Sequence, residues 1–119
     1  MKVTFIGLGI MGSRMAENLL ANYELTVFNR SQSPMIELQK KGADVAESAQ
    51  QAVREADVVF TMLSTPEVVE KVAWSKDGFL SQMKEQALWV DCSTVNPAFS
   101  RQSSEVAGTH NIRFVDAPV

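Results

Sequence analysis

The 119-residue chain contains one cysteine, Cys92, and one histidine, His110. A single cysteine excludes an intrachain disulfide, and a single histidine has no partner with which to hold a metal ion, so we expect no metal site. No apolar run approaches the roughly 20 residues that a membrane-spanning helix needs, and the N-terminus begins a strand instead of a signal peptide. These absences predict a cytoplasmic protein that binds no metal and no membrane.

Clusters of basic residues are also missing. The chain has 11 lysine and arginine residues against 14 aspartate and glutamate residues, which gives a formal net charge of −3. Proteins that hold nucleic acid electrostatically normally show clustered Lys and Arg, so we expect no nucleic-acid partner. The hydrophobic content of 45% is ordinary for a globular protein, and the length corresponds to one domain over residues 1–119.

Strand-like and helix-like runs alternate along the whole chain. Such alternation is typical of βαβ units and a parallel sheet. The predicted strands cover residues 2–6, 24–28, 44–46, 57–63, 87–91 and 112–116. The predicted helices cover residues 11–21, 34–41, 48–56, 66–74 and 97–107, with one further helical turn at 79–83. We therefore predict an α/β fold, a Rossmann-type doubly wound parallel sheet in the order 3-2-1-4-5-6.

Capping residues indicate where several helices begin and end. Ser33 precedes Pro34, and proline is favoured at the first helical position, so we expect Ser33 to cap the second helix. Thr65 should cap the helix that begins at Pro66 in the same way. Gly108 is expected to end the last helix, because glycine often follows the final helical residue.

A glycine-rich turn follows the first predicted strand without a spacer. The glycines have the Gly-x-Gly-x-x-Gly spacing, which also occurs by chance in loops, but here an apolar strand precedes it and an amphipathic helix follows. Gly7 permits the tight turn, Gly9 lets the backbone approach a pyrophosphate, and Gly12 lets the helix pack against the strand. Free amides and the positive end of the helix dipole then face the phosphates. We therefore assign dinucleotide binding to Gly7, Leu8, Gly9, Ile10, Met11 and Gly12.

The residues after the second predicted strand indicate which dinucleotide is preferred. Domains that bind NAD place an acidic residue there, which accepts hydrogen bonds from the adenosine ribose. Here Asn29 is neutral and Arg30 offers a fork of donors suited to the extra phosphate of NADP. Ser31 adds a hydroxyl contact. Most surface arginines are simply solvated, but the position of Arg30 directly after a strand favours NADP as the cofactor and NAD as the less favoured one.

Several segments in the correct order resemble the β-hydroxyacid dehydrogenases, the family of 3-hydroxyisobutyrate dehydrogenase, tartronate semialdehyde reductase and 6-phosphogluconate dehydrogenase. The glycine turn with its helix is similar to the N-terminal signature of that family, and Asn29-Arg30-Ser31 resembles its NADP-selective turn. The other segments are Met62-Leu63-Ser64, Asp91-Cys92-Ser93-Thr94-Val95-Asn96-Pro97 and Asp116-Ala117-Pro118-Val119. The residues of Asn29-Arg30-Ser31 and of the segment that begins at Asp91 are most similar to those of the glyoxylate/succinic semialdehyde reductase branch.

The resemblance implies hydride transfer between NADP(H) and a small β-hydroxyacid or its aldehyde or keto-acid partner. Leu63 and Ser64 would lie over the cofactor, Thr94 near the nicotinamide and the substrate, and Ser93 beside Thr94 at the substrate. Ser93 and Thr94 could instead only cap the next helix. The general-acid lysine of the family lies in an all-helical second domain, so we expect no catalytic residue in this chain and expect that lysine beyond Val119. Relatives of this kind form homodimers or homotetramers.

Two other classes of function share a glycine-rich turn. A nucleotide-sensing Rossmann module binds NAD(H) without chemistry, and a methyltransferase holds S-adenosylmethionine. Both more often keep an acidic residue where this chain has Asn29. A sensing module also has no need of the segments that begin at Asp91 and Asp116. The oxidoreductase is therefore the leading hypothesis, and the non-catalytic module is its alternative.

Overall fold

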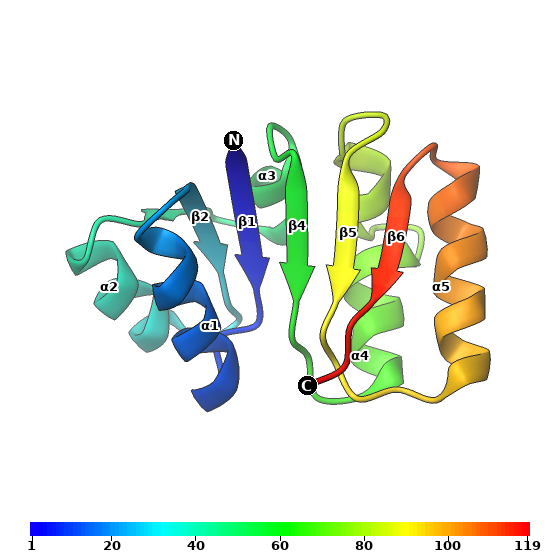
Figure 1. Ribbon diagram of the computed structural model, residues 1–119, viewed down its shortest axis with the longest axis horizontal. Helices are drawn as coiled ribbons and strands as arrows, with labels where there is room; N and C mark the ends of the chain where they lie inside the picture. Colours follow the sequence, from blue (N-terminus) through cyan, green and yellow to red (C-terminus); the bar gives the residue numbers. More distant parts are fainter.

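The computed structural model describes all residues from 1 to 119 and contains one six-stranded parallel sheet (Figure 1). The strand order is β3-β2-β1-β4-β5-β6, which confirms the predicted Rossmann-type topology. The strands are β1 (Lys2–Ile6), β2 (Glu24–Phe28), β3 (Asp44–Val45), β4 (Val58–Thr61), β5 (Leu88–Asp91) and β6 (Arg113–Asp116). Because all strands run the same way, their carboxyl ends meet at one edge, the lower edge in Figure 1.

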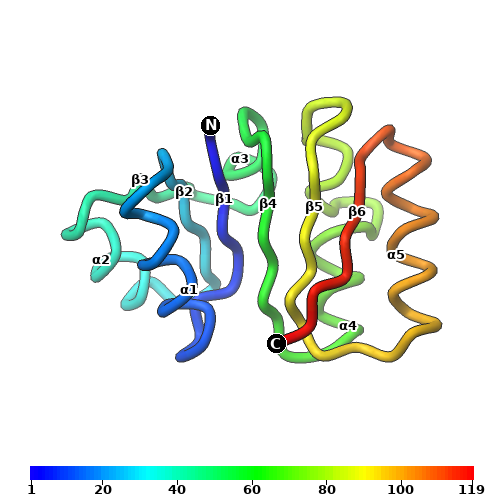
Figure 2. The backbone as a smooth tube through the Cα atoms, in the orientation of Figure 1, coloured from blue at the N-terminus to red at the C-terminus, as the bar shows by residue number.

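Helices connect the strands and cover both faces of the sheet. The α-helices are α1 (Ile10–Leu20), α2 (Gln32–Lys40), α3 (Ala49–Val53), α4 (Pro66–Val69) and α5 (Pro97–Thr109). A π-helix, η1 (Glu70–Trp74), continues α4, and a 3-10 helix, η2 (Phe79–Gln82), follows it. In the tube view of Figure 2 the chain turns from strand to helix at the lower edge after β1, β4 and β5.

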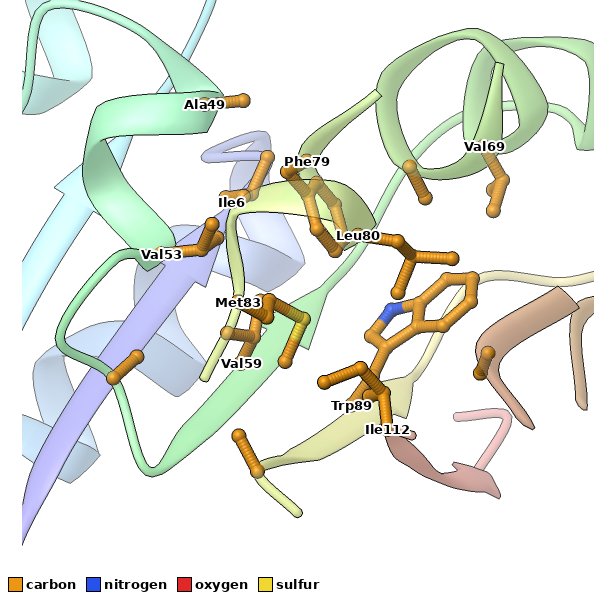
Figure 3. Close-up of a cluster of buried hydrophobic side chains, with 14 of the residues drawn as sticks. Ile6, Ala49, Val53, Val59, Val69, Phe79, Leu80, Met83, Trp89 and Ile112 are labelled. Carbon is orange, nitrogen blue, oxygen red and sulfur yellow. The ribbon is translucent and has the colours of Figure 1, made fainter. Parts of the chain in front are cut away.

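Two hydrophobic cores lie on opposite faces of the sheet because neighbouring strand residues point to opposite sides. Val3 and Phe5 of β1 pack in the smaller core with buried residues of α1 and α2, whereas Ile6 belongs to the larger one. Figure 3 shows the larger core, where Phe79 and Leu80 of η2 point toward Trp89 of β5. The rings of Phe79 and Trp89 meet edge to face, with their centroids 5.7 Å apart.

The predicted start of the second helix was wrong. The helix begins at Gln32, and Ser31 rather than Ser33 is its N-cap residue. Pro34 is therefore the third helical residue, not the first. Proline is tolerated there because the first amides of a helix have no intrahelical acceptor, so the missing N–H costs no hydrogen bond.

The predicted end of the last helix was also wrong. Gly108 lies inside α5, which continues to Thr109. The C-cap residue is His110, and Asn111, which follows it, has a left-handed φ of 60°. The amides of Asn111 and Ile112 donate to the carbonyls of Gly108 and Ala107, at 3.1 and 3.0 Å. This is a Schellman motif with asparagine where glycine is more usual, and asparagine tolerates the left-handed conformation.

Candidate cofactor site

The glycine turn between β1 and α1 has a geometry that only glycine permits at its first position. Gly7 has a φ of +100°, and its amide donates to the carbonyl oxygen of Phe28 at 3.1 Å. A Cβ atom on Gly7 would lie 2.2 Å from the carbonyl oxygen of Met62. The left-handed backbone and the neighbouring β4 loop therefore both exclude a side chain.

The other two glycines of the turn differ in what surrounds them. A Cβ on Gly12 would lie 2.0 Å from the carbonyl oxygen of Gly7, so this glycine permits the close approach of α1 to the turn. A Cβ on Gly9 would meet nothing within 4 Å, and Gly9 is exposed. No contact inside the protein explains glycine at position 9. The open space beside it fits a ligand that approaches the backbone closely, as a pyrophosphate does.

The first turn of α1 offers free donors beside that open space. Gly9 is the N-cap residue of α1, and no side chain caps the helix. The amides of Ile10, Met11 and Gly12 belong to the first turn, where a helix leaves its N–H groups without an intrahelical partner. Together with the helix dipole they favour an anion at this end of the 11-residue helix.

Asn29 connects the end of β2 to the glycine turn, a role that the sequence did not predict. Its Oδ1 accepts a hydrogen bond from the amide of Leu8 at 2.8 Å, and its Nδ2 donates to the carbonyl of Ser31 at 3.1 Å. The Leu8 amide is thus already engaged, and the Leu8 side chain is buried. The backbone donors of this turn that remain free for a ligand therefore lie after Leu8. The assignment of Leu8 itself to the cofactor stays a prediction.

Arg30 lies free at the carboxyl end of β2. Its side chain is exposed and forms no hydrogen bond or ion pair with the rest of the chain. It borders a cavity of about 370 Å³ together with Phe28 and Asn29 and with Met35 and Ile36 of α2. Ser31 is exposed beside it. An unpaired guanidinium at this edge is available to an anionic ligand.

A chain of buried hydrogen bonds connects the loops after β4 and β5. The Trp89 indole donates to Thr61 Oγ1 at 2.9 Å, and the Thr61 hydroxyl donates to Asp91 Oδ1 at 2.9 Å. The Ser93 amide donates to the same Oδ1 at 3.1 Å. Finally, Ser93 Oγ accepts the amide of Leu63 at 2.8 Å. We call these five residues the buried relay.

The residues that were predicted to contact cofactor or substrate differ in exposure. Ser64 and Thr94 are exposed at the carboxyl edge, and Leu63 is half-buried. Ser93 is fully buried, and its hydroxyl oxygen is used by Leu63, so in this structure it holds the β4 loop. Its contact with a substrate remains a prediction. The sequence motif that contains Ser93 and Thr94 does not indicate that the first side chain is buried and the second exposed.

Burial raises the pKa of the Asp91 carboxyl above its ordinary value of 3.8, against hydrogen bonds from Ser93 and Thr61 that lower it. The charge of Asp116 adds to the rise. Asp91 Oδ2 has no hydrogen-bond partner, which leaves one oxygen of a buried carboxyl unpaired. An unpaired buried oxygen makes the ionised form costly, so the protonated form is favoured more in the folded than in the unfolded chain.

This shift predicts how stability depends on pH. The contribution of Asp91 is fully present below pH 3.8 and is lost as the pH rises through the raised pKa of the folded state. Asp91→Asn cannot titrate and should remove this loss. We expect the urea midpoint of the wild type to fall relative to that of Asp91→Asn as the pH is raised from 3.8 toward neutrality. Lys84 lowers the pKa of Asp57, but Asp57 is present in both proteins, so its contribution to the pH dependence cancels in the difference between the two midpoints. Parallel pH profiles would contradict the prediction.

Four of the six lysines of the chain form ion pairs within the domain. Lys2, Lys40, Lys41 and Lys84 form ion pairs with Glu55, Glu37, Glu17 and Asp57. Lys71 and Lys76 lie in or directly after η1. No group of three or more His, Cys, Asp or Glu side chains could hold a metal ion. None of the helices has the length and apolar character needed to cross a membrane.

Comparison with known proteins identifies what kind of domain carries this site. The model of the family described as the NAD binding domain of 6-phosphogluconate dehydrogenase matches residues 2–119. The chain belongs to this family. The members it resembles are β-hydroxyacid dehydrogenases, as the sequence motifs predicted, and the chain is accordingly an NAD(P)-binding domain.

Several relatives of this NAD-binding domain match almost all of the chain. An NAD-dependent L-serine dehydrogenase of Pseudomonas aeruginosa is 41% identical over 99% of the chain and 40% of its own length. Glyoxylate/succinic semialdehyde reductase 1 of Arabidopsis thaliana is 39% identical over 100% of the chain and 42% of its own length. A solved 3-hydroxyisobutyrate dehydrogenase of Mycobacterium tuberculosis with L-serine is 35% identical, with a TM-score of 0.91, over 99% of the chain and 40% of that protein.

The chain therefore spans about two fifths of the length of the relatives it matches. Two solved structures with the same fold, Psf3 and an imine reductase of Myxococcus stipitatus, hold NADP+, and a variant of that imine reductase holds NAD+. The comparisons thus agree on a nicotinamide dinucleotide but not on which one.

Proposed function

We propose that this chain is the NADP-binding domain of an oxidoreductase that transfers hydride between NADP(H) and a small β-hydroxyacid or its aldehyde or keto-acid partner. The observation that carries the proposal is the turn from Gly7 to Gly12. It combines an open approach at Gly9 with uncapped amides at the start of α1. Relatives are named for 3-hydroxyisobutyrate and for glyoxylate or succinic semialdehyde, and the family resemblance adds tartronate semialdehyde to this class of substrates.

Each part of the site has a separate task in this reaction. The bound dinucleotide supplies or accepts the hydride. The amides of Ile10, Met11 and Gly12 would hold its pyrophosphate, and the exposed Thr94 would contribute a hydroxyl near the nicotinamide and the substrate. Ser93 orients the β4 loop through the Leu63 amide. The proton that follows the hydride onto the carbonyl oxygen would come from the general-acid lysine that the family resemblance implies, which we expect outside these residues.

The choice of NADP rests on the residues after β2. Asn29 brings no negative charge toward an adenosine ribose, and its Oδ1 is used to hold the glycine turn. Arg30 is exposed and unpaired, so its donors are free for a 2′-phosphate. A relative named as NAD-dependent is 41% identical to this chain, so the preference needs a direct measurement.

Titration of the chain with NADPH, NADH and S-adenosylmethionine tests the proposal. Isothermal calorimetry should give the lowest dissociation constant for NADPH and no saturation with S-adenosylmethionine. NADH binding at least as tight as NADPH would contradict the cofactor assignment, and absence of activity in the whole protein would favour the nucleotide-sensing module. The activity is then assayed on the whole protein with the acids named above, and its oligomeric state, expected to be a homodimer or homotetramer, is measured by light scattering.

Arg30→Ala should weaken NADPH binding about tenfold or more, because it removes hydrogen bonds between a cation and a phosphate, each of which contributes about 1.5–3 kcal/mol. NADH binding should change by less than about twofold, since NADH lacks that phosphate. Arg54→Ala is the matched control. Arg54 is also exposed and unpaired, but it is the C-cap residue of α3 and does not follow β2. Equal losses for both dinucleotides would assign Arg30 to the common part of the cofactor instead.

A further inference from the structure

The buried relay places one carboxyl group between two loops that are proposed to contact the cofactor. Thr61 is the last residue of β4 and lies two residues before Leu63, and Ser93 lies two residues after Asp91. The Thr61 hydroxyl and the Ser93 amide donate to the same oxygen, Oδ1 of Asp91. Trp89, Thr61, Asp91 and Ser93 are all fully buried, so water does not compete for these bonds.

The donor and acceptor roles in the relay follow from its first member. An indole N–H can only donate, so Thr61 Oγ1 accepts from Trp89, and the Thr61 proton is directed to Asp91. Asp91 Oδ1 is therefore required as an acceptor twice. The Leu63 amide in turn donates to Ser93 Oγ. The backbone amide of Ser93 is itself held by Asp91. Removing the acceptor would leave the proton of the buried Thr61 hydroxyl and the buried Ser93 amide without acceptors.

We propose that Asp91 is a positioning residue, which fixes the Leu63–Ser64 loop and the Ser93–Thr94 segment relative to each other so that both meet the same dinucleotide. This rests on the proposed function of the site. The role requires an oxygen acceptor and not a negative charge. The favoured protonation of the Asp91 carboxyl, together with its unpaired Oδ2, is consistent with such a role, because Oδ1 accepts in either state.

Two substitutions separate the acceptor from the charge. Asp91→Asn keeps an oxygen for Thr61 and Ser93 and places its amide nitrogen at the unpaired position. Asp91→Leu has a similar size but no acceptor. We expect Asp91→Leu to raise the NADPH dissociation constant about tenfold and Asp91→Asn to raise it less than about threefold. Thr61→Val, which keeps the shape of threonine and removes one donor, is the second variant in case Asp91→Leu does not fold.

A signature in the free protein makes the test independent of cofactor binding. In ¹H–¹⁵N spectra, Asp91→Leu should shift the Leu63 amide and the Trp89 indole resonance, while Asp91→Asn leaves the Leu63 amide near its wild-type position. The Trp74 indole has no hydrogen-bond partner and serves as the internal reference. Val53→Ala, a fully buried change on α3, controls for lost stability and should move neither the Leu63 amide nor the dissociation constant.

Two results would overturn the positioning role. One is an unchanged dissociation constant and unchanged Leu63 and Trp89 resonances in Asp91→Leu. The other is an equal defect in Asp91→Asn and Asp91→Leu, which would assign the effect to charge. A wild-type chain that binds no NADPH would contradict the proposed function, and the spectra of the free protein would still decide whether Asp91 holds the two loops together.

Discussion

Gly9→Val should leave the domain folded and weaken NADPH binding about 10- to 100-fold. Gly9 has an ordinary φ of −68°, and a Cβ there meets no atom of the protein within 4 Å. A branched side chain would fill the space beside the first-turn amides of α1 and keep a pyrophosphate away from them. An overpacked contact costs about 1–3 kcal/mol, and each 1.4 kcal/mol is a factor of ten in affinity.

The matched control for this change is Gly108→Val. Gly108 is also an exposed glycine whose Cβ would meet nothing within 4 Å, but it lies near the end of α5. Binding is measured by calorimetry, and the fold by circular dichroism and urea denaturation of the free protein. We expect Gly108→Val to keep the wild-type dissociation constant. If Gly9→Val binds NADPH as tightly as that control does, the pyrophosphate does not lie at the turn.

Gly12→Ala should destabilise the folded protein by at least about 3 kcal/mol, a value at the upper end of overpacking costs. The added Cβ would lie 2.0 Å from the carbonyl oxygen of Gly7 and 3.3 Å from the ring of Phe5. Gly7 cannot move away easily, because its amide bonds to Phe28 and its Cα faces the carbonyl of Met62. The severe clash joins the added Cβ, whose position the backbone fixes, to a backbone oxygen, so no side-chain rotation relieves it.

Urea denaturation measures this loss as a lower midpoint at an unchanged slope. Gly108→Ala is the control, since it is the same change in an exposed helical position. It should stabilise the protein by about 0.5–1 kcal/mol, because alanine favours a helix interior over glycine. A Gly12→Ala protein with wild-type stability would show that α1 can shift away from the turn.

The sheet could be predicted from the sequence because its signals are local and repeated. Apolar runs of strand length alternate with helical segments, and right-handed crossovers leave few ways to connect them. The glycine spacing, Asn29 and Arg30 likewise lie at positions that a pattern of neighbouring residues identifies. These features predict the fold and a nicotinamide dinucleotide, and the structure and the family match confirm both.

The errors in helix ends have a common physical origin. Pro34 is accepted at any of the first helical positions, so it does not mark which residue begins α2. Gly108 is accepted inside α5 because its Cβ would point into open space, and Asn111 takes the left-handed position that ends the helix. Neither residue type is restricted to one position, so local preference alone cannot choose between neighbours.

The sequence by itself determined the order of strands and helices, the site of the glycine turn and the family, because each depends on residues close together along the chain. Only the tertiary structure decided what those residues do. The Asn29 side chain holds the Leu8 amide across 21 residues, and Ser93 holds the Leu63 amide across 30. Ser93 is therefore a buried residue that holds the loop after β4, whereas its neighbour Thr94 is exposed. Burial and hydrogen bonding over such separations arise from packing β1, β2, β4 and β5 into one sheet.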